Sequence, residues 1–196
     1  KRLRGNAELP GGRLNLAVLL SRQGRTSEAM EEYRQALKLD PYFVPARVNL
    51  VTLASGAQQL DEAERLLREG LALEKMPATD HGNLAYMLAL LLVEQGKLDQ
   101  APQWMETAAQ ALPQNTRIRY NQGLLLSRLN RRDEAINALQ QGLVQAPDDA
   151  DLLYSLIYLH ALAGERSDAY PYVQHLRKVA PDDPRLQAIE PYWQKP

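Results

Sequence analysis

Short polar segments divide the chain into stretches of similar length, and each segment ends in an alanine. These alanines recur with a period of about 34 residues and one interval four residues longer, at Ala29, Ala63, Ala101, Ala135 and Ala169. Apolar residues follow each alanine at helical spacing, and a proline closes four of the five stretches. This pattern predicts helix–turn–helix units that repeat along the chain. We therefore expect an all-α protein with ten repeat helices of about 12 to 15 residues and one further C-terminal helix.

Small residues recur at two more places in the period. We number the residues of each 34-residue unit so that its alanine named above is position 20. Position 8 then lies 12 residues before this alanine and position 27 lies seven residues after it. Alanine or glycine occupies position 8 in three of the five units and position 27 in four of the five. Two antiparallel helices need small side chains where their backbones approach most closely. Positions 8, 20 and 27 are therefore predicted to lie at the contact between the two helices of each unit.

This period and these registered positions resemble the tetratricopeptide repeat family over residues 10–183. The resemblance implies a right-handed α-solenoid of five repeats, at about residues 10–43, 44–81, 82–115, 116–149 and 150–183. Residues 1–9 are expected to form a tail or the end of an upstream segment, and residues 184–196 a capping helix and tail. The family's tryptophan at position 4 is absent, and four extra residues predict a longer connection around residues 74–82.

Two aspartate pairs follow a proline and precede a predicted helix: Asp148–Asp149 and Asp182–Asp183. They are better explained as helix N-caps and first-turn acids than as metal ligands or general acids. After Pro184, the residues Leu186, Ile189 and Trp193 share one helix face, so this face is expected to cover the last repeat. Pro191 is expected to shorten or kink that helix.

Composition and charge exclude several classes of function. The 196 residues carry a net charge of −1, which argues against a nucleic-acid-binding protein, and they contain no cysteine. No apolar run is long enough for a membrane-spanning helix. The histidines His160 and His175 are expected to be packed or rim residues rather than a metal pair, and no catalytic motif is present. We expect a protein that is not an enzyme and needs no cofactor or metal.

The resemblance implies that the first helix of each repeat lines a concave groove. The polar and apolar residues expected to contact a peptide there are Asn15, Asn49, Thr52, Tyr86, Arg117, Tyr120, Asn121, Leu124, Tyr154 and Tyr158. Tyrosine offers a rigid apolar face with a polar tip, and asparagine can donate to and accept from a peptide backbone. The same residue types also help neighbouring repeats of this family to pack, so both roles stay open.

The predicted partner is a protein or peptide bound in that groove. A chaperone C-terminus is disfavoured because the family's carboxylate clamp needs lysine at inward positions, whereas Arg117 is the one basic residue at positions 2, 5, 6 and 9. The alternative is a structural or assembly scaffold that uses the convex face or the ends of the solenoid. Residues 40–50 and 118–125 also resemble repeat segments attached to bacterial multihaem cytochromes. That resemblance implies a docking part of a larger periplasmic protein, and without it a cytoplasmic location is expected.

Overall fold

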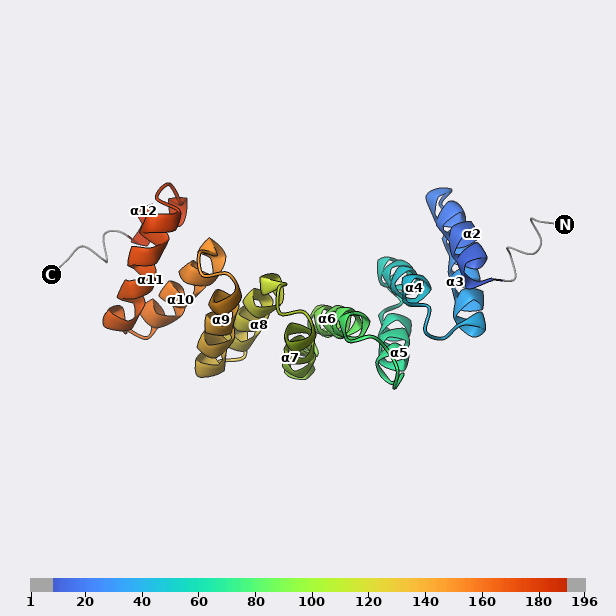
Figure 1. The fold of residues 1–196 in the computed structure, drawn as a ribbon, viewed down its shortest axis with the longest axis horizontal. Helices are drawn as coiled ribbons and strands as arrows, with labels where there is room; N and C mark the ends of the chain where they lie inside the picture. The colour runs from blue at the N-terminus through green and yellow to red at the C-terminus, as the bar shows by residue number, and fades with distance from the viewer. Residues whose placement is uncertain (1–8, 190–196) are drawn as a thin grey trace. The chain divides into compact units, whose positions relative to one another are not determined.

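The computed structural model describes residues 9–189, and every regular element within this range is a helix (Figure 1). Eleven α-helices and one short 3-10 helix are present in the described residues. The helices are α2 (Pro10–Arg22), α3 (Thr26–Leu39), α4 (Val44–Gly56), α5 (Leu60–Leu71), α6 (Ala78–Glu94), η1 (Leu98–Gln100), α7 (Ala101–Ala111), α8 (Thr116–Arg128), α9 (Arg132–Gln145), α10 (Ala150–Leu162), α11 (Arg166–Val179) and α12 (Pro184–Ile189). The all-helical repeat fold is thus confirmed. None of these helices combines the length and the apolar character that crossing a membrane requires.

The chain forms two compact units. Unit 1 ends at Ala111, and its helices pack as the pairs α2–α3, α4–α5 and α6–α7. Unit 2 begins at Leu112 and contains the pairs α8–α9 and α10–α11, followed by α12. The assignment of residues 10–183 to one repeat domain remains a prediction.

The small residues lie where helices approach closely, as predicted, but the closest neighbour of Gly142 at position 27 is Leu152 on α10 of the next repeat rather than a residue of its own pair. All five alanines at position 20 are fully buried. In unit 2 a Cβ atom added to Gly123 of α8 would lie 2.6 Å from Cγ of Leu139 on α9. A Cβ on Gly142 would lie 2.8 Å from a methyl carbon of Leu152. Glycine is therefore required for the observed packing at both positions.

The four extra residues between the second and third repeats are placed differently from the prediction. Helix α6 begins at Ala78, four residues before the predicted repeat start at residue 82, and its 17 residues make it the longest of the described helices. The connection between α5 and α6 covers residues 72–77, which is two residues longer than the four-residue connection between α3 and α4. The insertion therefore adds a turn to α6 more than it lengthens the loop.

The turn within each repeat uses a left-handed backbone conformation. Gly24, Gly96 and Gly164 adopt φ angles of 76°, 75° and 74°, and Gln58 and Asn130 adopt 59° at the equivalent places. The second repeat therefore keeps the turn although it lacks the glycine. Residues with a Cβ atom incur a steric cost in this conformation.

Two of the predicted N-caps are confirmed. The carboxylate of Asp149 accepts hydrogen bonds from the backbone N–H groups of Asp151 and Leu152, and that of Asp183 accepts from the N–H of Arg185. After this cap, Leu186 of α12 is buried against the cluster that includes Ile157. Helix α12 thus covers the last repeat, whereas Pro191 and Trp193 lie outside the described residues.

Candidate functional site

Unit 2 contains a pocket of about 220 Å³ between α8, α9 and α10. Four of the residues predicted to bind a peptide line it together: Tyr120, Leu124, Tyr154 and Tyr158. The other lining residues are Gly123, Ser127, Leu139, Ser155 and Leu159. No residue of the lining carries a charge.

The repeat itself positions the tyrosines and Leu124. Tyr120 and Leu124 are four residues apart on α8, and Tyr154 and Tyr158 are four residues apart on α10, so each pair projects from one helix face. The absence of a side chain at Gly123 lets Leu139 of α9 come close behind this face. The pocket is therefore a product of helix periodicity and of the close α8–α9 contact.

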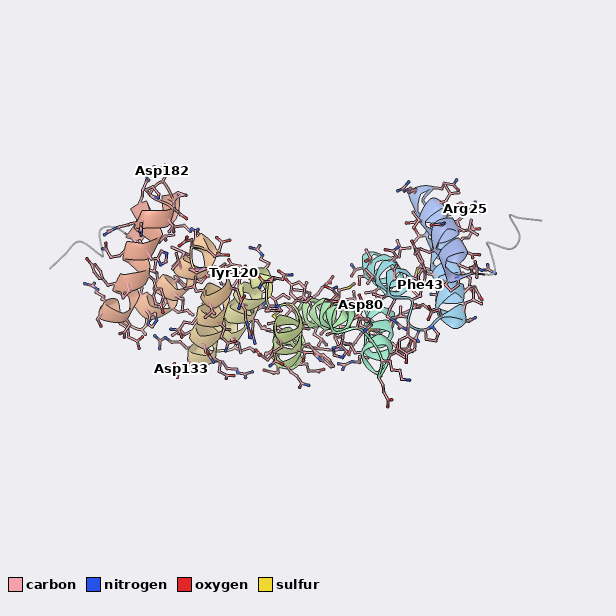
Figure 2. The ribbon with its side chains drawn as sticks, in the orientation of Figure 1. Arg25, Phe43, Asp80, Tyr120, Asp133 and Asp182 are labelled. Atoms are coloured by element: carbon pink, nitrogen blue, oxygen red, sulfur yellow. The ribbon has the colours of Figure 1, made fainter. Side chains whose placement is uncertain are left out.

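The four residues differ in how far they are exposed. Leu124 and Tyr158 keep 46% and 51% of their surface exposed, whereas Tyr120 and Tyr154 are half-buried (Figure 2 labels Tyr120). Tyr120 packs against the buried core that includes Leu139, and Tyr154 packs against the core that includes Ile157. Tyr120 and Tyr154 thus support the fold and line the pocket at once, while Leu124 and Tyr158 expose apolar surface to solvent.

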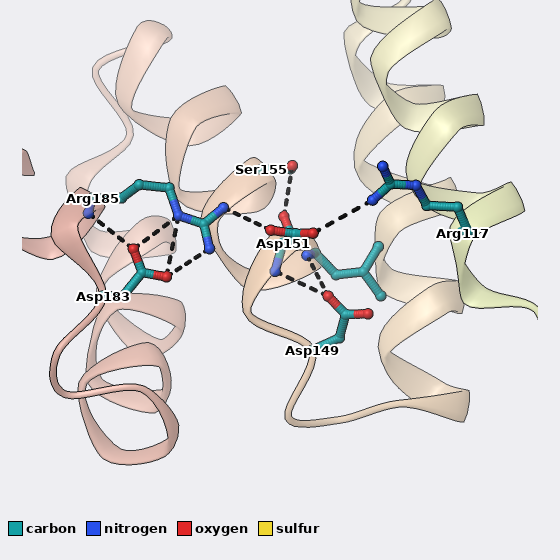
Figure 3. A network of polar contacts seen from close by, with 7 residues as sticks. Arg117, Asp149, Asp151, Ser155, Asp183 and Arg185 are labelled. Carbon is teal, nitrogen blue, oxygen red and sulfur yellow. Dashed lines mark hydrogen bonds and ion pairs between the residues drawn. The ribbon is translucent and has the colours of Figure 1, made fainter.

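A row of charged side chains, Arg117, Asp151, Asp183 and Arg185, links α8, α10 and the start of α12 (Figure 3). Arg117 lies over the ring of Tyr120 at 4.9 Å, and Arg185 lies over the ring of Tyr154 at 4.8 Å. Asp151 joins the two arginines, with N–O distances of 3.6 Å to Arg117 and 2.8 Å to Arg185. The three charged residues recur with the period of the repeat. Arg117 and Asp151 therefore occupy position 2 of their repeats, and Arg185 occupies the equivalent place after the fifth repeat.

Asp183 is the last charged residue of this row, and its carboxylate lies 2.6 Å from the guanidinium of Arg185. The hydrogen bonds from Arg185 hold the pKa of Asp183 below its ordinary value, with burial acting in the opposite direction. Each of the two arginines that lie over the tyrosine rings is thus paired with at least one carboxylate. The role of Arg185 was not predicted because this residue lies beyond the fifth repeat, although its spacing of one full period from Asp151 was a usable signal.

The other predicted residues do not line this pocket. Asn121 is half-buried on α8 and already has an interaction partner. The remaining four belong to unit 1: Asn15 on α2, Asn49 and Thr52 on α4, and Tyr86 on α6.

In unit 1, two of the polar side chains already have partners. Burial raises the pKa of Tyr33 and the neighbouring Asn49 side chain opposes that rise, and the hydroxyl of Thr52 donates to the carbonyl of Val48 at 2.9 Å. Asn15 is exposed, and Tyr86 is half-buried with a partner of its own. The asparagines that the repeat register makes equivalent thus have different surroundings.

One group of side chains has the composition of a metal site. Ligand atoms of His160, Glu165 and Asp168 lie within 4.8 Å of one another. Arg132, however, pairs with the Glu165 carboxylate, which also lies 2.9 Å from Nδ1 of His160. The hydrogen bonds from His160 and Arg132 lower the pKa of Glu165. This arrangement is an ion-pair network that ties α9 to the α10–α11 turn.

His175, the other histidine considered above as a metal ligand, also has an acidic partner. Nε2 of His175 on α11 lies 2.7 Å from the carboxylate of Asp148. His160 in turn stacks on the ring of Tyr172, with 5.9 Å between the ring centroids. Both histidines are therefore packed or rim residues, as expected from the sequence.

Comparison with known proteins agrees with this architecture. A tetratricopeptide repeat family profile matches residues 20–78 and 126–190, and a second profile of the same description matches residues 83–107. No curated protein is significantly similar in sequence.

Several solved structures share the fold. YrrB, a tetratricopeptide repeat protein with an unusual peptide-binding site, has a TM-score of 0.71 and 23% identity, over 97% of this chain and 96% of its own. The MamA protein has a TM-score of 0.69 and 16% identity, over 95% and 96%. PilF of Pseudomonas aeruginosa has a TM-score of 0.67 and 19% identity, over 94% and 82%.

Proposed function

Because the chain belongs to the tetratricopeptide repeat family, we propose that it is a protein-interaction module that holds an apolar side chain of an extended partner peptide in the α8–α10 pocket. Proteins with this repeat are typically interaction modules without enzymatic activity, which supports a binding role. YrrB, which shares the fold, has a peptide-binding site.

The neutral lining of the pocket is the observation that carries the proposal. Exposed Leu124 and Tyr158 flank the half-buried rings of Tyr120 and Tyr154, and no charged residue lines the space. Its volume of about 220 Å³ lies below the range of about 300–1,000 Å³ that is usual for small-molecule sites. The pocket is thus better suited to one apolar side chain than to a whole cofactor.

The spacing of the helices suits an extended ligand. A peptide in that conformation rises about 3.3 Å per residue, and packed helices lie about 8–10 Å apart, so roughly three ligand residues separate contacts to α8 and α10. Arg117 and Asn121 lie on the same helix as Tyr120 and are proposed to contact the ligand's polar groups. Asn15, Asn49, Thr52 and Tyr86 of unit 1 remain proposed contacts for a longer partner.

The assembly alternative has one observation in its favour. Leu16 and Leu19 of α2 are 39% and 53% exposed, and Leu9 just before this helix is 58% exposed. These residues give the first helix of unit 1 an apolar surface that a neighbouring subunit could cover. In that case the solenoid would act as a scaffold through its end.

Partner capture followed by pocket mutations tests the proposal. Proteins retained by the purified chain are mapped to a short peptide, whose affinity is measured by fluorescence anisotropy. Leu124→Ala and Tyr158→Ala are expected to weaken binding about tenfold or more each, if these exposed residues anchor the peptide. Leu162→Ala is the matched control, because Leu162 is 67% exposed on α10 but lies outside the pocket lining.

Salt dependence and mutation together separate the two functions. Affinity for a neutral pocket should change little with ionic strength, unlike that of a charge-steered complex. If both pocket variants bind as tightly as the parent while changes at Leu16 or Leu19 abolish capture, the scaffold role is correct and the pocket is not the contact surface.

A further inference from the structure

Unit 1 contains a different kind of pocket, on α3, α4 and α5 and the loops beside them. Its volume is about 420 Å³, and its lining includes four cations, Arg34, Lys38, Arg47 and Arg65, but a single carboxylate, that of Glu69. Neutral pockets and cationic pockets recognise different ligands. This pocket therefore calls for an explanation of its own, independent of the function proposed for unit 2.

Arg47 is the most deeply buried of the four cations that line this pocket. Arg47 is 4% exposed, and it donates to the carbonyl of Leu66 at 2.7 Å and to the carbonyl of Pro41 at 2.9 Å. Both of these residues, together with Glu69, also line the pocket. The contacts thus hold the guanidinium against the cavity wall.

Arg47 lacks a close counter-ion. Its nearest carboxylate is that of Glu69 at 4.0 Å, and Glu69 lies closer to Arg65, at 2.5 Å. The buried Nε of Arg47 has no hydrogen-bond partner, and burial lowers the pKa of the guanidinium. A buried cation without a tightly held anion is costly, so an anion that enters the pocket gains by pairing with it.

Lys38 is the second cation without a short ion pair. Of the other two, Arg34 binds Glu62 at 2.8 Å and Arg65 binds Glu69. Lys38 is exposed near the C-terminal end of α3, and within residues 9–189 its recorded charge interaction is a longer-range one with Glu31, whose pKa it helps to lower. The cations of this pocket without a close carboxylate are therefore the buried Arg47 and the exposed Lys38.

The remaining wall of the pocket is apolar. Leu37, Pro41 and Leu73 line it beside the two cations. A ligand that satisfies both parts needs an anionic head for the cations and an apolar body for the wall. Guanidinium and carboxylate groups have matching planar geometry, which favours a carboxylate over a spherical anion.

We propose that the α3–α5 pocket of unit 1 binds a carboxylate attached to an apolar body, with the carboxylate between Arg47 and Lys38. The carboxylate can belong to a small organic acid or to an acidic residue of a peptide, since both present the same group. This site does not depend on the tyrosine-lined pocket of unit 2. Its failure or success therefore leaves the proposed function of unit 2 unaffected.

Titration of the whole chain, followed by backbone amide NMR, tests the proposal. Hexanoate is the small-acid probe, a blocked leucine–glutamate–leucine peptide is the peptide probe, and hexanamide is the neutral isostere. We expect either carboxylate to shift the amide signals of Lys38, Leu66 and Glu69, with hexanamide much weaker. The tighter of the two carboxylate probes identifies the source of the ligand.

Two substitutions assign the binding to the proposed cations. Lys38→Gln should weaken hexanoate binding roughly two- to fivefold, as for loss of one partly exposed ion pair, and Arg47→Lys should weaken it through loss of the planar fork. Lys178→Gln, at an exposed lysine on α11 of unit 2, is the matched control. Equal shifts with hexanoate and hexanamide, or an unchanged affinity in Lys38→Gln, would overturn the proposal even if Arg47→Lys failed to fold.

Discussion

Replacing Gly123 with alanine tests the close contact between α8 and α9 on which the unit 2 pocket depends. The added Cβ would lie 2.6 Å from Cγ and 2.7 Å from Cδ2 of Leu139. Cγ is the branch point of a fully buried side chain, so Leu139 cannot move away as the tip of a flexible side chain could. The substitution must therefore push the two helices apart or force Leu139 out of its rotamer.

Two opposing effects set the size of the change. Alanine in place of glycine within a helix favours folding by about 1 kcal/mol, whereas overpacking a core costs about 1–3 kcal/mol. We expect Gly123→Ala to lower the free energy of unfolding by up to about 2 kcal/mol. Gly56 is the control, since a Cβ there has no neighbour within 4 Å and Gly56→Ala should be neutral or stabilising by up to about 1 kcal/mol.

Urea unfolding followed by circular dichroism measures the difference between the two variants. A double-mutant cycle with Leu139→Ala strengthens the assignment, because Gly123→Ala should become stabilising once the Leu139 side chain is removed. The expected coupling energy is about 1–3 kcal/mol. If Gly123→Ala stabilises the protein as much as Gly56→Ala does, the close contact between α8 and α9 is wrong.

Three further changes probe other parts of the fold. Gln58→Gly should raise the free energy of unfolding by up to about 1 kcal/mol in a denaturant titration, because glycine relieves the left-handed conformation at φ 59°; a loss of stability would contradict this. Ala135→Leu should lower the thermal midpoint, since Ala135 is fully buried and overpacking costs about 1–3 kcal/mol. The ion pair with Arg185 depresses the pKa of Asp183, so its stabilising effect is present at neutral pH and lost as the pH falls below about 4. Asp183→Asn should therefore lower the free energy of unfolding at neutral pH and make it depend less on pH below about 4. If the free energy of unfolding depends on pH in the variant as it does in the parent, Asp183 does not stabilise the fold in this way.

The repeat period was sufficient to predict the helices and their small contact residues, because repeated local patterns fix both. The extra turn of α6 could not be predicted, since residues 78–81 contain no strong helix start signal and the four-residue insertion fits a loop equally well. Tyr120 and Tyr154 could be assigned to one face from helix periodicity alone. Their division between core packing and pocket lining depends on residues of other helices, on Leu139 of α9 for Tyr120 and on the cluster with Val173 and Leu176 of α11 for Tyr154.

The contacts of Arg47 also could not be predicted from the sequence. Its place at position 4, where the family has tryptophan, was evident from the sequence, but a long side chain can extend in several directions. Its contacts with the carbonyls of Pro41 and Leu66 depend on how α4 packs against α5. Gly70 makes room for this packing, because a Cβ there would lie 2.7 Å from Cδ of Arg47. The pairing of position 4 with position 27 thus appears only once the helices are in place.

Isotope-filtered NMR of the complex with the captured peptide shows whether the unit 2 pocket receives an apolar side chain. We expect nuclear Overhauser contacts from one apolar side chain of the peptide to the ring protons of Tyr120, Tyr154 and Tyr158. Contacts of that side chain confined to another surface, such as exposed Val144 on α9, with none to these rings, would contradict it.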